Sequence, residues 1–117
     1  MSGRVSYYSG LAAEEIVARD YERRGYLLRE QRWRGPGGEI DLIFEKAGAL
    51  VFVEVKKARD FALAAARITQ RQVDRILTSA SCYLGRMPAG QNTQMQVDAA
   101  LVDGRGKIQI LENALAF

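Results

Sequence analysis

Three charged residues interrupt two stretches of the chain that are otherwise apolar. Asp41 lies within residues 39–44, and Glu54 and Lys56 lie within residues 50–56. Burying a carboxylate or an ammonium group costs free energy unless it is paired or bound to a metal ion, because the charge loses its hydration. These three residues therefore need a chemical explanation.

The two stretches predict neighbouring strands of a hairpin with its turn at residues 46–49. If the loop holds two residues, Lys46 pairs with Ala49. Counting outward from this pair then places Asp41 opposite Glu54. A four-residue loop keeps this register, whereas an odd loop or a bulge shifts the pair to a diagonal. Since side chains alternate across a strand, Glu54 and Lys56 share one face.

Two carboxylates opposite each other on a sheet repel. A divalent cation between Asp41 and Glu54 would remove the repulsion, and Lys56 adds a fixed positive charge. Oxygen ligands, open positions for water and phosphate, and an adjacent ammonium group suit metal-assisted phosphodiester hydrolysis, in which Lys56 would orient the water or stabilise developing charge. The alternative is a buried ion pair between Lys56 and one carboxylate, with no catalytic role.

The composition narrows the metal and the partner. The chain has no histidine, which excludes Ser-His-Asp triads and His-ligated zinc, and it has no Gly-x-x-x-x-Gly-Lys-Ser/Thr phosphate-binding loop. A site made of oxygen ligands favours Mg²⁺ or Mn²⁺. The net charge of +3 and the pI near 9.2 lean toward a polyanionic partner.

The length of 117 residues predicts a single domain, 1–117, with residues 1–8 as a flexible tail. No apolar run reaches the roughly 20 residues that cross a bilayer, and the N-terminus lacks the apolar core of a secretory signal. The single cysteine, Cys82, excludes an internal disulfide framework. We therefore expect a cytoplasmic protein.

Apolar spacing and turn signals predict the elements that position the charged residues. In chain order these are a helix over 9–24, strands over 26–30, 39–44 and 50–56, a helix over 69–84, and strands over 96–102 and 107–111. Gly25 caps the first helix, and Thr69 with Gln72 forms a capping box for the second. Residues 34–38 predict a mobile glycine-rich break, and 58–68 a linker or short helix. The order predicts a mixed sheet with helices packed on it.

The first helix carries a further carboxylate. Glu14 borders its apolar stripe, which consists of Ala13, Val17, Ala18 and Tyr21. If this helix crosses the charged strands, Glu14 reaches the metal directly or through water. The alternative is a partly exposed surface glutamate.

Basic residues gather before and along the second helix. Arg67, Arg71 and Arg75 recur every four residues and form a stripe on it or leading into it. Further candidates for phosphate contacts are Lys57, Arg59 and the segment Arg32-Trp33-Arg34. As a group they predict a groove for a nucleic-acid backbone, although each arginine taken singly fits a solvated helix face.

These residues together carry a family resemblance. The pattern comprises Ala13-Glu14, Gly25-Tyr26, Trp33-Arg34, Gly38-Glu39-Ile40-Asp41-Leu42-Ile43 and Val51-Phe52-Val53-Glu54-Val55-Lys56. It resembles the YraN family of uncharacterised bacterial proteins, which is similar to PD-(D/E)xK nucleases, among them restriction endonucleases and archaeal Holliday-junction resolvases. The resemblance covers nearly the whole chain. It implies an α/β, restriction-endonuclease-like core, α-β-β-β-α-β(-β), with a central mixed sheet flanked by helices.

The resemblance also implies roles for the residues. Asp41, Glu54 and Lys56 would be the catalytic signature and Glu14 the helix-borne acid, with Asp41, Glu54 and Glu14 binding Mg²⁺ or Mn²⁺. The implied activity is hydrolysis of phosphodiester bonds in DNA, including branched or processed DNA, by a homodimer as in related resolvases. The alternative is a non-catalytic nucleic-acid-binding accessory protein that retains the nuclease fold.

Three positions depart from the family pattern. Ala13 replaces a usual glycine, Arg32 replaces a common asparagine, and Gln72 replaces a common lysine. Losing that lysine removes one candidate phosphate contact. Asp98 matches an acidic position in the penultimate strand, where we expect a structural role.

Overall fold

A computed structural model describes residues 3–113 as one mixed sheet with helices on both faces. In chain order the elements are α1 (Gly3–Arg23), β1 (Leu27–Gly35), β2 (Gly38–Lys46), β3 (Ala49–Lys57), α2 (Phe61–Ala66), α3 (Gln70–Leu84), the 3₁₀ turn η1 (Gly90–Asn92), β4 (Met95–Val102) and β5 (Ile108–Leu111). The strands lie in the order β1-β2-β3-β4-β5. All neighbours are antiparallel except β3 and β4, which run parallel because α2 and α3 carry the chain back between them.

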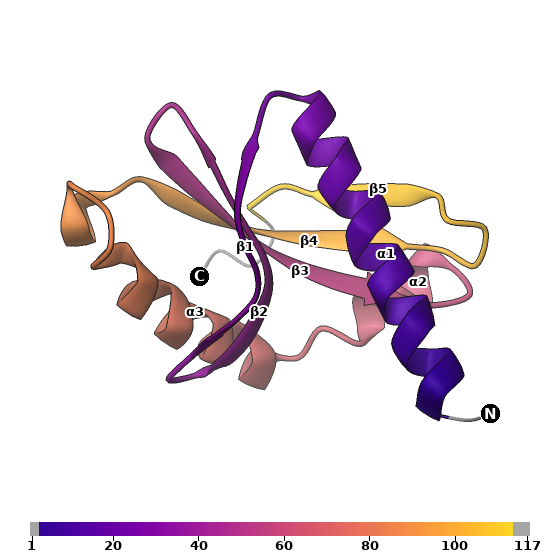
Figure 1. Cartoon of the computed structure of the whole chain (residues 1–117). Coiled ribbons are helices and arrows are strands. Elements are labelled where there is room, and N and C mark those ends of the chain that lie inside the picture. The colour runs from indigo at the N-terminus through magenta and orange to yellow at the C-terminus, as the bar shows by residue number, and fades with distance from the viewer. Residues whose placement is uncertain (1–2, 114–117) are drawn as a thin grey trace.

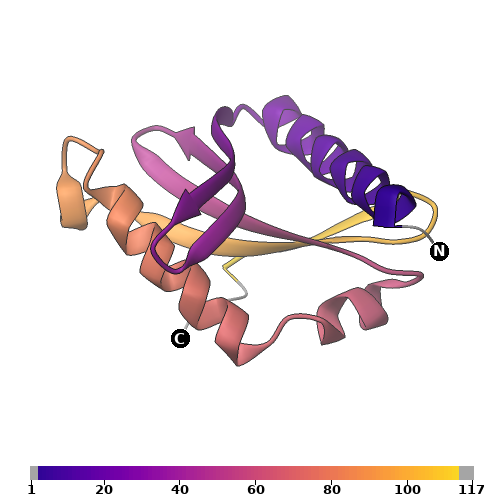
Figure 2. The same cartoon turned by 60° about the horizontal axis from the view of Figure 1, so that its bottom comes forward.

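The predicted fold class is confirmed. The described chain has the α-β-β-β-α-β-β order of a restriction-endonuclease-like core, with the short helix α2 added before α3. Figure 1 shows α1 crossing β3 and β4, while α3 runs beside the β1–β2 hairpin. Figure 2 shows the two helices on opposite sides of the strands. None of the described helices is long and apolar enough to cross a membrane.

The central strands are covered on both faces, as their continuous apolar runs predict. Side chains of β2 and β3 that face α1 are Leu42, Phe44, Val51 and Val53, and those that face α3 are Ile43, Leu50 and Phe52. All of them are buried. A charged side chain in these strands is therefore surrounded by apolar neighbours unless it lies where the strands separate.

Helix α1 buries the apolar stripe predicted for it, Ala13, Val17, Ala18 and Tyr21. Gly25 ends the helix with φ of 92°, a left-handed conformation that glycine adopts without strain. The Tyr26 N–H donates to the Tyr21 carbonyl over 3.1 Å, and the two rings pack edge to face at 5.3 Å. The predicted cap is confirmed, and it fixes how the chain enters β1.

The helix begins earlier than predicted. Its start at Gly3 places residues 3–8 of the expected flexible tail in α1. Residues 1–2 of that tail lie outside the described residues.

The β2–β3 hairpin has the two-residue loop that the register argument requires. Lys46 pairs with Ala49, and the two residues between them, Ala47 and Gly48, have φ of 53° and 82°. Positive φ at both central positions is the type I′ geometry that matches the twist of the flanking strands. The ladder then continues in register as far as the pair Leu42–Val53.

The segment 34–38 is not a mobile break, contrary to the prediction. A two-residue turn joins β1 to β2 there. The Gly37 N–H donates to Ser79 Oγ on α3 over 3.0 Å. A Cβ atom at Gly37 would lie 2.3 Å from the Arg75 carbonyl oxygen. Glycine is needed here because the turn packs closely on α3, a tertiary requirement rather than a local one.

The connection from β3 to α3 contains the short helix α2, and both α2 and α3 begin with an N-terminal capping residue. The Asp60 carboxylate accepts the Leu63 N–H over 2.9 Å and begins α2. Thr69 Oγ1 accepts the Gln72 N–H over 3.2 Å and begins α3, as predicted. Of the two alternatives for residues 58–68, the structure therefore shows the helix.

Candidate functional site

The strands β2 and β3 separate at the charged residues. The ladder ends at the pair Leu42–Val53, and the same register continued by one step places Asp41 opposite Glu54, as predicted. Instead of a backbone partner, the Val55 N–H donates to Asp41 Oδ2 over 2.7 Å. Figure 1 shows the β1–β2 hairpin curving away from β3. The end of the ladder and the bond to Val55 place the Asp41 carboxylate at this separation, which we call the fork.

The alternation of β2 changes at the same point. Ile40 and Ile43 both pack in the core beneath α3, although residues three apart in a regular strand face opposite sides. The irregularity lies between them, at Asp41. It lets the Asp41 carboxylate interact electrostatically with Glu54 of β3 and with Glu14 of α1.

The Asp41 carboxylate is strongly perturbed. Burial, and then the negative charge of Glu54, raise the pKa of Asp41 from its ordinary 3.8 to about 8. The Val55 N–H and the Lys56 charge act in the opposite direction but do not prevail. At neutral pH Asp41 holds a proton and hydrogen-bonds to Glu54. A divalent cation beside the pair would stabilise both carboxylates and release that proton.

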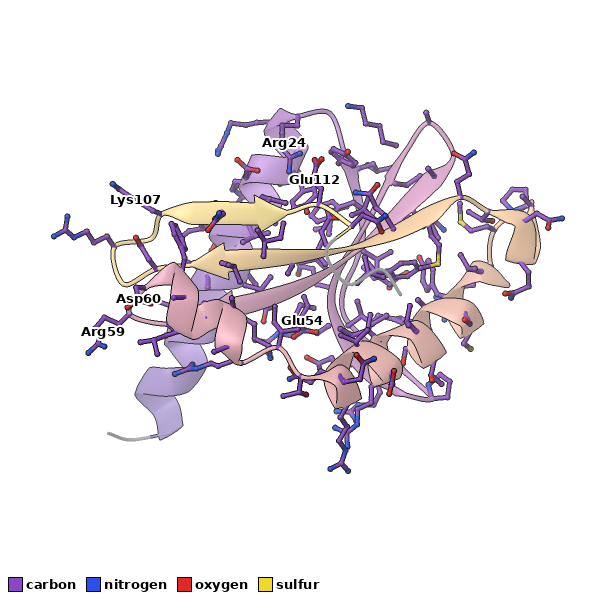
Figure 3. The ribbon with its side chains drawn as sticks, turned by 180° about the vertical axis from the view of Figure 1, so that it is seen from behind. Arg24, Glu54, Arg59, Asp60, Lys107 and Glu112 are labelled. Carbon is purple, nitrogen blue, oxygen red and sulfur yellow. The ribbon has the colours of Figure 1, made fainter. Side chains whose placement is uncertain are left out.

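Lys56 forms an ion pair with Glu54. Its Nζ lies 3.4 Å from Glu54 Oε1, and the two side chains are 18% and 11% exposed. They share one face of β3, as the alternation predicts. Figure 3 shows Glu54 near the middle of the molecule, between α2 and the start of α3.

Gln72 also reaches this site, which the sequence analysis missed. In one orientation its amide oxygen accepts the Thr69 N–H over a long 3.4 Å and completes the capping box. In the reversed orientation the oxygen accepts from Lys56 Nζ and the nitrogen donates to the Arg67 carbonyl, both at 2.9 Å. We favour the second, since it satisfies both ends of the amide. In the sequence, the spacing from Thr69 to Gln72 already accounted for Gln72 as part of a capping box, so its contact with Lys56 was not expected.

Glu14 borders the site from α1, as expected, but another residue engages its carboxylate. Arg32 Nε and Nη2 donate to Glu14 Oε1 and Oε2 over 3.1 and 3.4 Å. Burial raises the pKa of Glu14, and the charges of Asp41 and Glu39 raise it further, whereas Arg32 lowers it. The sequence marked Arg32 as a candidate for phosphate contacts and as a departure from the family pattern, but not as a partner of Glu14. Its pairing with Glu14 joins residues 18 apart and has no local signal.

The donor set fits a hard cation. In the part of the chain that the structure describes, no group of three or more His, Cys, Asp or Glu side chains lies close enough together to cage a metal ion. The pair Asp41 and Glu54 remains. Mg²⁺ is commonly bound by one or two carboxylates while it keeps waters and takes phosphate oxygens from a substrate. Two adjoining carboxylates are therefore sufficient for such an ion.

The predicted phosphate-contacting residues are only partly assembled around this pair. Arg75 of α3 lines a cavity of about 120 Å³ together with Glu39, Glu54 and Gln72. Arg71 is exposed one turn earlier on the same helix. These two arginines keep the predicted four-residue spacing on one helix face.

Three further basic candidates, Arg67, Arg34 and Arg59, have other contacts. Arg67 follows α2 and donates to the Lys57 carbonyl over 2.9 Å. Arg34 is exposed, 3.8 Å from Glu39. Arg59 pairs weakly with its neighbour Asp60 at 4.0 Å, and Figure 3 shows both at the outer end of the molecule, on the side of Lys107 and away from Glu54. The structure therefore does not bring Arg59 to the site.

Asp98 has the surroundings of a structural residue, as expected. Its side chain is 1% exposed. It accepts from Tyr21 Oη over 2.5 Å, from Gln96 Nε2 over 2.8 Å and from the Asn113 N–H over 2.8 Å. These bonds tie α1 and β4 to Asn113, two residues beyond the end of β5. Three protein donors thus already bind this carboxylate.

A larger cavity, of about 520 Å³, lies at the opposite end of the sheet. Tyr26, Lys46 and Gln94 are among its lining residues, which include none of the charged residues of the fork. The charged residues of the fork therefore do not line the larger of these two cavities.

Comparison with known proteins places the chain in a family. Residues 13–102 match the model of "Uncharacterised protein family UPF0102". UPF0102 proteins of Cereibacter sphaeroides strain ATCC 17029, Ruegeria pomeroyi and Roseobacter denitrificans are 52%, 52% and 50% identical to the chain. The alignments cover 99%, 96% and 98% of this chain and 99%, 91% and 89% of the relatives. The chain therefore belongs to the UPF0102 family, which is the YraN family that its motifs predicted.

Proposed function

We propose that the protein is a metal-dependent nuclease that hydrolyses phosphodiester bonds in DNA. The observation that carries this proposal is the half-buried carboxylate pair of Asp41 and Glu54 at the strand fork, with the pKa of Asp41 raised to about 8. Carboxylates that share a site in this way are stabilised by a divalent cation. Perturbed carboxylates with a specific partner occur preferentially at functional sites.

The residues take roles that follow from their positions. Asp41 and Glu54 hold Mg²⁺ or Mn²⁺, which, when bound, polarises a phosphate and lowers the pKa of a water molecule. Lys56, 3.4 Å from Glu54, orients the attacking water or stabilises charge that develops on the phosphate. Arg71 and Arg75 on the neighbouring helix contact the DNA backbone through its phosphates.

Cleavage assays with defined variants test this proposal. Purified protein is incubated with Mg²⁺ or Mn²⁺ and with single-stranded, duplex, flapped and four-way-junction DNA, and with RNA. We expect metal-dependent cleavage of DNA that falls by at least about a hundredfold in Glu54→Gln and Lys56→Ala. The matched controls are Glu112→Gln and Lys107→Ala, whose exposed side chains lie away from the fork and should leave cleavage unchanged.

The same assays separate the alternatives. DNA binding with no cleavage in any metal would support the non-catalytic accessory protein in place of the nuclease. If neither binding nor cleavage occurred with any of the nucleic acids, both proposals would fail. Cleavage that survives in Glu54→Gln would place the active site elsewhere.

Gln72 should matter for rate rather than for metal binding. Replacing it with leucine removes the 2.9 Å acceptor of Lys56 Nζ while keeping a side chain of similar size. We expect kcat to fall about tenfold, because a loosely held catalytic group spends less time in its productive position. Mn²⁺ affinity should not change. Gln70→Leu, in the same turn of α3, is the control, and equal loss in both variants would argue for a helix-stability effect instead.

A further inference from the structure

Arg32 has a backbone conformation that its residue type seldom adopts. Its φ of 50° lies in the left-handed region, although it occurs in the middle of β1. The other described non-glycine residues with positive φ are Ala47, in the hairpin turn, and Asn113. Asparagine tolerates this region far better than arginine does. Surrounding contacts must therefore hold Arg32 in place.

The pairing of β1 with β2 shows what lies opposite Arg32. The flanking pairs Gln31–Leu42 and Trp33–Ile40 place Arg32 opposite Asp41 on β2. From there its guanidinium reaches both oxygens of Glu14, at 3.1 and 3.4 Å. The planar fork of arginine matches a carboxylate in this two-point geometry. The side chains of Arg32 and Glu14 are 32% and 17% exposed, so this pair is partly removed from solvent.

Once a metal ion displaces the proton of Asp41, the charges around the fork are nearly balanced. Glu39, whose charge also acts on Glu14, is paired with Arg34 at 3.8 Å and is not counted. The three carboxylates of Glu14, Asp41 and Glu54, when ionised, face two cationic side chains, Arg32 at one end and Lys56 at the other. One negative charge remains. A single divalent ion between Asp41 and Glu54 more than balances it, whereas a second ion beside Glu14 would meet the guanidinium at close range.

We propose that Arg32 takes the place of a second cation, so that the site binds one divalent ion and Glu14 holds Arg32 rather than a metal. This inference rests on the proposed metal site at Asp41 and Glu54 and deepens it. It assigns Arg32 as the residue that sets the metal stoichiometry. It also revises the expected role of Glu14 from metal ligand to positioning residue.

Titration of the intact protein with Mn²⁺ tests the inference without any activity assay. Bound ions are counted by calorimetry and by the electron paramagnetic resonance signal of free Mn²⁺. We expect one ion per wild-type chain and a second, weaker ion in Arg32→Asn, because asparagine accepts the backbone conformation and leaves Glu14 available. Arg32→Asn combined with Glu14→Gln should return to one ion. Arg34→Asn, an exposed arginine of the same strand, should stay at one.

The outcomes separate the inference from the proposed function. Two ions on the wild type, or one ion on Arg32→Asn, would overturn the role of Arg32 and leave the metal site standing. One ion on the wild type that persists in Glu54→Gln would show that the counted ion is not at the fork, and the inference would fail with it. No ion on any variant would overturn the proposed metal-dependent nuclease itself.

Discussion

Replacing Asp41 by asparagine is expected to make the folded protein more stable at pH 8–9 while removing its affinity for divalent ions. Burial and the charge of Glu54 raise the pKa of Asp41 to about 8, so the folded state resists ionisation of this group. Asparagine has nearly the same shape. Its side-chain oxygen can still accept the Val55 N–H, and its amide can donate to Glu54, so the substitution removes charge and little else.

The direction of the pH dependence follows from the two pKa values. In the unfolded chain the carboxyl group ionises near its ordinary 3.8, and in the folded chain near 8. Between these values the folded state binds a proton that the unfolded state has lost, so the free energy of unfolding decreases as the pH rises from about 4 to 8. Asp41→Asn lacks this decrease. Since one pKa unit corresponds to about 1.4 kcal/mol, we expect a gain of at least about 2 kcal/mol at pH 9 and little difference at pH 4.

Urea unfolding between pH 4 and pH 9, with a chelator present, measures this effect. Asp74→Asn is the control, since that exposed carboxylate of α3 should change the free energy of unfolding by no more than about 0.5 kcal/mol. Adding Mg²⁺ at pH 8 should stabilise the wild type by mass action and leave Asp41→Asn unchanged. Parallel pH curves for wild type and Asp41→Asn would contradict the interpretation that desolvation and the charge of Glu54 raise the pKa of Asp41.

The sequence was most informative where structure depends on near neighbours. The apolar stripe of α1 recurs at helical spacing, so the face on which the helix packs was predictable. The turn at 46–49 allows few loop lengths, so the register of the β2–β3 hairpin was predictable as well. The register in turn placed Asp41 opposite Glu54. Half of the candidate site, the acidic pair with its lysine, therefore follows from local rules.

What the sequence could not supply depends on contacts between distant segments. β1 runs to residue 35, although only its first part was predicted, because a bulge between Leu28 and Glu30 and the left-handed Arg32 break the alternation that marks a strand. The glycines after it signalled mobility, whereas they allow close packing on α3. The contacts of Arg32 with Glu14 and of Gln72 with Lys56 likewise exist only in the folded chain. These contacts surround the acidic pair, and no motif encodes them.

Asp98→Ala should be among the most destabilising single changes in the chain, with a loss of about 3–5 kcal/mol. The substitution leaves the buried Tyr21 hydroxyl and the Asn113 N–H without the acceptor that each has now. Burial, and then the bond to Asp98, raise the pKa of Tyr21 above its usual range, so the hydroxyl keeps its proton and donates. Asp20→Ala, which removes exposed ion pairs on α1, should cost less than about 1 kcal/mol.

A double-mutant cycle separates this contact from general damage to the core. Tyr21→Phe keeps the ring stacked on Phe44 at 4.6 Å and removes only the hydroxyl, at an expected cost of about 1.5–3 kcal/mol. If Tyr21 and Asp98 stabilise the protein through their shared hydrogen bond, the double variant should lose less than the two single variants combined. Strict additivity would mean that the bond contributes little. If Mn²⁺ binding persists in Asp98→Asn, Asp98 is not a ligand of the ion. Its role is then to stabilise the packing of α1 on β4, which positions Asp41 and Glu54.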